Sequence, residues 1–160
     1  MEPEPLLSPR DVELVQGGVS VIAAARTGDL APMVARALGC RVAPDRREVT
    51  LFLSQTTAAG VLSCLRESGA IAVVFSQPST HRTLQLKGDD ARILPLDPQD
   101  LTLIEGYRQR FAEDLGKIGY TPAFADAVVA MMPDLVGVRF TPSAAFQQTP
   151  GPDAGKRLRP

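Results

Sequence analysis

Short β-type runs separated by turn residues constrain the fold of this chain more than any other feature. The apolar run at residues 70–75, AIAVVF, predicts a strand buried on both faces, and after a Gln-Pro-Ser-Thr break extended sequence resumes from Thr83 to Pro95. Further strand-like runs lie at residues 19–25, 31–42, 48–54 and 135–146. Parallel strands need crossover connections of about a dozen residues or more, and antiparallel strands do not. The short connections here predict a barrel or sandwich of about six antiparallel strands with helices outside it.

Helix signals interrupt these runs at four places. Ser8-Pro9 is a cap followed by a first-turn proline, and it opens a short helix that ends at Gly17-Gly18. A second helix is expected from Thr56 to Ser68, where apolar residues recur at helical spacing before Gly69. Asp97 or Asp100 is expected to cap a longer helix, and Thr121-Pro122 opens a last one that runs to Met132.

The length of 160 residues suits one domain with one core. We expect that domain at residues 1–147, followed by a Pro- and Gly-rich arm at residues 148–160. The formal net charge is −1, so no global field draws nucleic acid or a membrane surface. No apolar run approaches the roughly 18 residues that span a bilayer, and the first ten residues lack the basic-then-apolar pattern of a signal peptide. A cytoplasmic location is the resulting expectation.

Cysteine and histidine are scarce in this sequence. Cys40 and Cys64 are too few for a disulfide framework and too far apart for a C-x-x-C pair, so we expect both to be small buried apolar residues. His81 is the single histidine, so the sequence disfavours both a His-based metal site and a Ser-His-Asp triad. We predict no metal site, and no catalytic acid or base is evident.

The order of these elements resembles the pyridoxamine 5′-phosphate oxidase-like family of split β-barrels that bind flavin mononucleotide (FMN). Three features carry the resemblance: the element order over roughly residues 10–147, the string AIAVVFSQPSTHRTLQLKG, and VARALGCRV with Arg36 in the place of a family arginine. The resemblance implies a homodimer with FMN in a cleft at the interface. It also implies an oxidoreductase acting on a small molecule.

The resemblance assigns cofactor contacts to two groups of residues. Phosphate and ribityl contacts fall to Arg36 and to the start of the central helix, namely Ser54, Gln55, Thr56 and Thr57. A phosphate needs charge-assisted donors, and the free N–H groups of a helix N-terminus form a ready anion site. The flavin side of the cleft falls to Arg82, Thr83, Gln85 and Lys87.

Gly60 and Val61 stand where the oxidases of this family place an Arg-Lys pair. Each charge-assisted contact contributes about 1.5–3 kcal/mol, so the loss of two weakens a phosphate site by a factor of about a hundred or more. This departure leaves two alternatives open: a non-catalytic dimer that has lost tight flavin binding, or a related barrel that binds haem through His81 or binds a deazaflavin. The same residues also have explanations that need no ligand. The arginines can face solvent, residues 54–57 can cap the helix, and His81–Arg82 can form an exposed loop tip.

Overall fold

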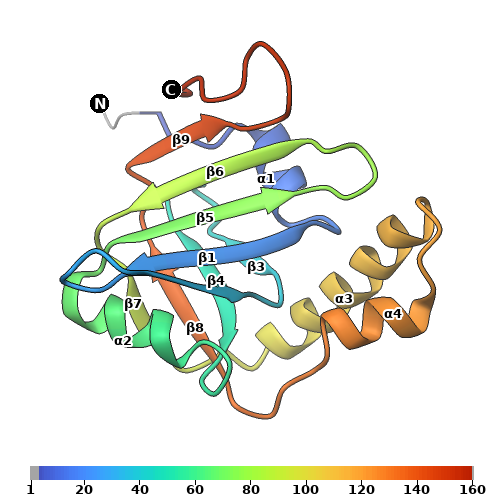
Figure 1. Cartoon of the computed structure of the whole chain (residues 1–160), viewed down its shortest axis with the longest axis horizontal. Helices are drawn as coiled ribbons and strands as arrows, with labels where there is room; N and C mark the ends of the chain where they lie inside the picture. The colour runs from blue at the N-terminus through green and yellow to red at the C-terminus, as the bar shows by residue number, and fades with distance from the viewer. Residues whose placement is uncertain (1–3, 160) are drawn as a thin grey trace.

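Two antiparallel sheets form the body of the protein in a computed structural model that describes residues 4–159 (Figure 1). The five-stranded sheet has the order β2-β1-β5-β6-β9 and the four-stranded sheet the order β3-β4-β8-β7. The strands are β1 (Ser20–Arg26), β2 (Pro32–Arg36), β3 (Cys40–Val42), β4 (Val49–Ser54), β5 (Ile71–Ser76), β6 (Thr83–Gly88), β7 (Arg92–Leu94), β8 (Leu135–Phe140) and β9 (Ala144–Gln147). The split-barrel class with flanking helices is confirmed.

The described residues form nine strands instead of the expected six, because three long runs each divide between the two sheets. Residues 31–42 give β2 and β3, residues 83–95 give β6 and β7, and residues 135–146 give β8 and β9. Gly39, at φ +88, lies where the chain passes from β2 in one sheet to β3 in the other. A Cβ there would lie 2.7 Å from Cγ of Tyr107. Gly88 ends β6 against the Phe140 ring. A bend forced by tertiary packing leaves no periodic signal in the sequence.

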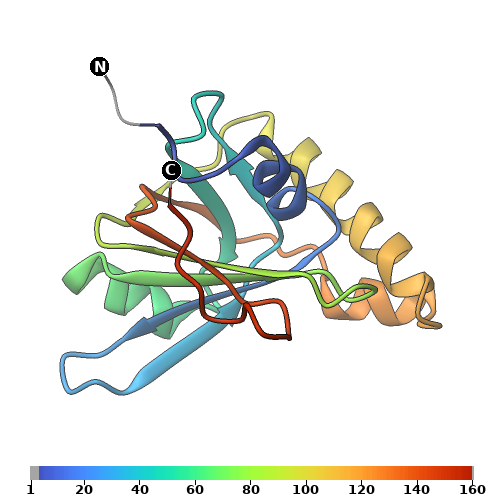
Figure 2. The same ribbon diagram turned by 90° about the horizontal axis from the view of Figure 1, so that it is seen from above.

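The core lies between the two sheets (Figure 2). Its largest fully buried side chains include Phe52, Phe75 and Phe140. Along β5 burial alternates, with Ile71, Val73 and Phe75 buried and the residues between them half-buried. The prediction that this strand is buried on both faces is therefore wrong, because no element within residues 4–159 fully covers its second face.

In the described part of the chain, four helices flank the sheets: α1 (Pro9–Val15), α2 (Ala59–Ser68), α3 (Asp100–Gly116) and α4 (Pro122–Val128). The predicted caps at Ser8 and Thr121 accept hydrogen bonds from the first turns of α1 and α4, and Gly69 ends α2 at φ 68. The other two starts differ from expectation. Helix α2 begins after Ala58 and α3 after Gln99, and neither has a side-chain cap.

The C-terminal segment folds back along β9. The Gln147 N–H donates to the Lys156 carbonyl (2.9 Å), the Leu158 N–H donates to the Ala145 carbonyl (2.8 Å), and an isolated bridge joins Phe146 to Arg157. Within residues 4–159, no helix is long and apolar enough to cross a membrane.

Candidate functional site

One face of the five-stranded sheet points away from the core, and we call it the outer face. It carries Ile22, Ala24, Ala72 and Val74, all half-buried, from β1 and β5. In Figure 1 this face points toward the viewer, and neither Figure 1 nor Figure 2 shows a described helix lying over it. An uncovered face of small and apolar residues is able to receive a ligand or another chain.

Four of the predicted cofactor residues lie on the outer face. Cross-strand pairing puts Arg36, Ile22, Val74 and Gln85 in one row. Lys87 pairs with Ala72 and Thr83 pairs with Ser76, so both project from this face as well. Three strand spacings separate Arg36 from Gln85, roughly 14 Å. The structure therefore gathers Arg36, Thr83, Gln85 and Lys87 on a single surface of about the breadth of a cofactor.

The contacts of these side chains with other described residues are polar or aromatic, and none of those contacts is an ion pair. Arg36 Nη1 donates to Ser20 Oγ (2.8 Å), and Thr83 Oγ1 shares a hydrogen bond with Ser76 Oγ (2.8 Å). The Gln148 side-chain amide donates to Gln85 (3.2 Å), and Lys87 Nζ lies 5.2 Å from the centroid of the Phe146 ring. Both cations thus keep donors that an anionic ligand could engage.

A hollow of about 370 Å³ opens at one end of the outer face. Its floor contains Ala24 and Ala72, which pair directly across β1 and β5, and Arg26 and Lys87 stand beside it. Sequence reasoning missed Arg26. The signal was present, because counting by twos along β1 from Ile22 and Ala24 reaches Arg26 on the same side of the strand.

The second predicted group, Ser54 to Thr57, lies away from the outer face at the end of β4. Ser54 is buried and its Oγ accepts from the Thr57 N–H (3.2 Å), while Gln55 to Thr57 are exposed. No hydrogen bond or ion pair between described residues joins this group to Arg36. Gly60 lies nearest to β2, where a Cβ would be 3.2 Å from Met33 Sδ.

Asp134 accepts hydrogen bonds from N–H groups of this loop, which the family resemblance assigns to a phosphate. Its Oδ2 accepts the Thr56 N–H (2.7 Å), and its carbonyl accepts the Gln55 N–H (3.1 Å). Hydrogen bonds from Thr56 and Ser54 hold the pKa of this carboxyl below its usual value. Its Oδ1 is buried without a hydrogen-bond partner among the described residues. A negative charge is therefore fixed close to the start of α2.

The two positions that replace the family's basic pair differ in their surroundings. Gly60 is exposed, whereas Val61 is only 1% exposed and belongs to the core. A cation in place of Val61 would be buried, so that position has no room for a solvent-facing charge. The first-turn N–H groups of α2 still have no side-chain cap, which leaves them as donors.

The β5–β6 turn carries Arg82 and His81, and Asp114 of α3 anchors this turn. Asp114 accepts from the Ser79 N–H (2.9 Å), Ser79 Oγ (2.7 Å) and the Gln77 side-chain amide (3.2 Å). Burial works to raise the pKa of Asp114, but these hydrogen bonds and one from Lys117 outweigh it and the pKa is lowered. His81 is exposed with φ 60 at the tip, and Arg82 is half-buried just before β6.

The two cysteines match the expectation of buried apolar residues, since both are free and buried. Burial raises the pKa of the Cys40 thiol to about 12. A thiol that remains protonated at neutral pH is a poor nucleophile.

Comparisons with known proteins report on the fold. No protein-family model matches the sequence, and no curated protein matches it. Among solved structures, the HupZ protein of Group A Streptococcus is similar at a TM-score of 0.57 and 14% identity, over 93% of this chain and 99% of that one. A protein named F420 reductase is similar at a TM-score of 0.53 and 17% identity, over 86% of this chain and 98% of that one. A candidate pyridoxamine 5′-phosphate oxidase from Lactobacillus delbrueckii is similar at a TM-score of 0.52 and 15% identity, over 88% of this chain and 93% of that one. At these identities the likeness establishes a shared fold, which confirms the resemblance at that level.

Proposed function

We propose that this protein is a homodimeric flavin-binding protein that holds FMN on the outer face of its five-stranded sheet and acts as an oxidoreductase on a small molecule. The observation that carries the proposal is the combination of an alanine floor with cations that have no acidic partner. Within residues 4–159, no carboxylate lies within ion-pair distance of Arg26, Arg36, Arg82 or Lys87.

The outer face fits a flavin in two respects. The small side chains of Ala24 and Ala72 leave a flat apolar floor, which suits a planar ring system. Arg26 and Lys87 beside this floor are placed to stabilise negative charge on a ring, and Arg36 in the neighbouring row is a donor for a phosphate. When bound, FMN would supply hydride chemistry, while the protein supplies binding, orientation and charge.

Asp134 opposes this fit at the start of α2. Its carboxylate already accepts the Thr56 N–H, and its charge repels a phosphate that approaches the uncapped first turn. We therefore assign the phosphate chiefly to Arg36, with Ser54, Gln55, Thr56 and Thr57 as the weaker part of the site. Thr83 and Gln85 remain proposed contacts on the flavin side, together with Arg82 at the edge of the face.

A second copy of the chain would complete the site. The hollow is open to solvent, and the half-buried Ile22 and Val74 and the exposed Val34 continue its apolar surface across the sheet. Packing the outer faces of two chains together would bury these side chains and enclose the ring between them. The dimer and the cofactor site are thus one proposal.

A deazaflavin is the second candidate cofactor, and one comparison favours it. The structure named F420 reductase is as similar in fold as the candidate pyridoxamine 5′-phosphate oxidase. F420 and FMN both present a flat three-ring system, so the alanine floor suits either. Titration of the same preparation with each cofactor separates the two.

Absorbance titration followed by gel filtration tests the proposal. We expect a yellow complex with FMN that elutes as a dimer. The variants Arg36→Ala and Lys87→Ala should each weaken binding about tenfold or more, because each removes a charge-assisted contact. Arg10→Ala, an exposed arginine on α1, is the matched control and should change nothing. If no coloured complex survives gel filtration and Arg36→Ala has no effect in titration, the flavin proposal is wrong.

A further inference from the structure

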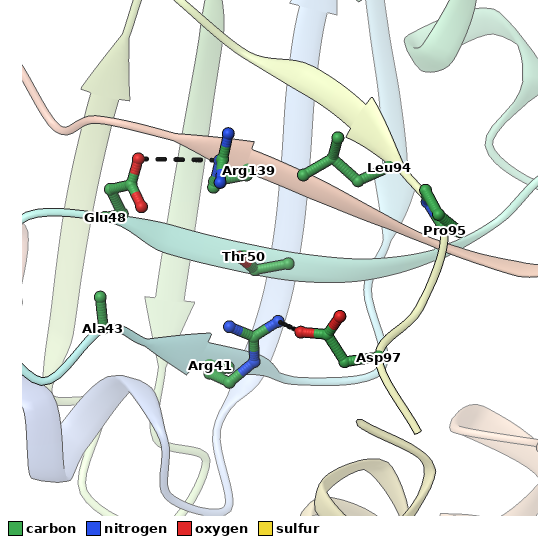
Figure 3. A pocket seen from close by; sticks show the side chains of 8 residues that line it. All are labelled: Arg41, Ala43, Glu48, Thr50, Leu94, Pro95, Asp97 and Arg139. Atoms are coloured by element: carbon green, nitrogen blue, oxygen red, sulfur yellow. Dashed lines mark hydrogen bonds and ion pairs between the residues drawn. The ribbon is translucent and has the colours of Figure 1, made fainter. Parts of the chain in front are cut away.

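The outer surface of the four-stranded sheet holds a second cavity, of about 260 Å³, that the flavin proposal does not use (Figure 3). Thr50 lies at its centre on β4. Arg41 of β3 and Arg139 of β8 pair with Thr50 from either side, so the two arginines stand on one face with backbones roughly 10 Å apart. Leu94, Pro95 and Ala43 give the cavity its apolar parts.

Each arginine in this cavity keeps N–H donors available. Arg41 donates through Nε to Asp100 (2.9 Å) and through Nη2 to Asp97 (3.0 Å), which leaves Nη1 without a hydrogen-bond partner among the described residues. Arg139 has no hydrogen bond from its guanidinium within residues 4–159, and its Nε lies 3.7 Å from Glu48 Oε1 as an ion pair only. Two guanidinium groups that flank one hydroxyl form a place for a carboxylate.

Acceptors alternate with these donors around the cavity. Glu48 beside Arg139 is 45% exposed, and its side-chain oxygens accept no hydrogen bond from the described residues. Asp97 on the opposite side is 56% exposed. The lining thus carries two positive and two negative groups, and the buried Asp100 paired with Arg41 adds a third carboxylate. A phosphate or a simple anion would meet more repulsion than attraction, whereas a ligand with both charges would find a partner for each.

We propose that this cavity binds a small zwitterion of the α-amino acid class. The carboxylate lies over Thr50 between Arg41 and Arg139, and the ammonium group lies against Glu48. The closeness of Glu48 to Arg139 fits a ligand whose carboxylate and ammonium groups are attached to the same carbon atom. The small cavity and its aliphatic wall at Leu94 and Pro95 suit a short side chain.

Calorimetric titration of the full chain with L-alanine tests this proposal. Propionate, which lacks the ammonium group, and ethylamine, which lacks the carboxylate, are the matched probes. We expect L-alanine to bind at least tenfold more tightly than either, because each of them leaves one charged partner in the cavity unmatched. Equal binding of propionate and L-alanine would overturn the zwitterion assignment, and so would the absence of binding by all three.

Two variants locate the site. Arg139→Gln and Glu48→Gln should each weaken L-alanine binding about tenfold or more, and both residues are exposed enough for the fold to persist. Arg10→Gln and Glu67→Gln change exposed charges on helices away from this sheet face and should leave binding unchanged. Undiminished binding by Arg139→Gln would place the ligand elsewhere and refute the proposal. FMN is absent from every arm, so the result is independent of the flavin proposal.

Discussion

The outer surfaces of the two sheets differ in whether their cationic side chains have acidic partners. On the five-stranded sheet, Arg26, Arg36 and Lys87 have no acidic partner among the described residues, and Arg26 and Lys87 line a hollow with Ala24 and Ala72. On the four-stranded sheet, Arg41 and Arg139 are each paired with carboxylates. The first surface can accept a net anion, whereas on the second the carboxylates already outnumber the arginines. The same residue type therefore serves different chemistry according to where the carboxylates lie.

Asp134 and Asp114, near the predicted flavin residues, accept mainly from backbone, hydroxyl and amide groups, and an exposed lysine, Lys117, also pairs with Asp114. Asp134 accepts from Thr56, and Asp114 accepts from Ser79 and Gln77. Beside the other sheet, Asp100 at the start of α3 is 1% exposed and accepts from Arg41 and from the Asp97 N–H. The variants below test this contrast.

Gly39→Ala removes the chain crossing on which both surfaces depend and should have the largest effect. The residue lies at φ +88, and its new Cβ would meet the Tyr107 ring at 2.7 Å. Left-handed strain and overpacking together should lower the free energy of unfolding by about 3 kcal/mol. Urea denaturation measures the change. Gly28→Ala, where nothing lies within 4 Å, is the control, and equal stability of the two variants would contradict this explanation.

Asp100→Ala should be the next most damaging because it leaves Arg41 and the Asp97 N–H without their buried acceptor. We expect a loss of about 2 kcal/mol or more in denaturant unfolding. Asp97→Ala removes the 56% exposed partner of the same arginine and should cost less than about 1 kcal/mol. Similar costs for the two variants would show that Asp100 has no special role in the paired surface.

Asp134→Asn should make the region near the flavin site more receptive to an anion. The substitution removes the fixed charge beside the start of α2, so affinity for FMN should rise about fivefold in absorbance titration. Glu113→Gln removes an exposed carboxylate on α3 and should leave the affinity unchanged. A fall in affinity would mean that the loop geometry set by Asp134 matters more than its charge.

Asp114→Asn should change how stability depends on pH. The folded-state pKa of Asp114 is lowered, so its contribution is fully present above the unfolded pKa of about 3.9 and is lost as the pH falls through the lower folded pKa. The wild-type protein should therefore lose its advantage over the variant below about pH 4. Urea denaturation over a pH series measures it, and a constant difference would contradict the cause assigned.

Arg139→Gln should have the smallest effect on stability. Its pair with Glu48 is 3.7 Å long and about half exposed, so the unfolding free energy should change by less than about 0.5 kcal/mol. Thermal or chemical denaturation beside Arg10→Gln provides the comparison. A larger loss would show that the pair supports the sheet itself.

Sequence patterns predicted the parts of the fold that local chemistry controls. The caps at Ser8 and Thr121 and the stop at Gly69 follow from side-chain donors and from glycine conformation. The division of the long runs was not predictable, because the bend at Gly39 depends on Tyr107, which lies far along the chain. Strand alternation could group Thr83, Gln85 and Lys87, whereas Asp134 is 78 residues from Thr56 and no spacing rule connects them.

The return of the C-terminal segment along β9 has a consequence for self-assembly. Hydrogen bonds from Gln147 and Leu158 occupy the edge of the five-stranded sheet that β9 would otherwise expose. Edge strands with free backbone groups can recruit further chains and build open polymers. With this end blocked, strand pairing between copies through the five-stranded sheet is left to β2 at its opposite edge. Growth through one edge can only join two sheets head to head, so such pairing stops at a closed pair instead of a fibre.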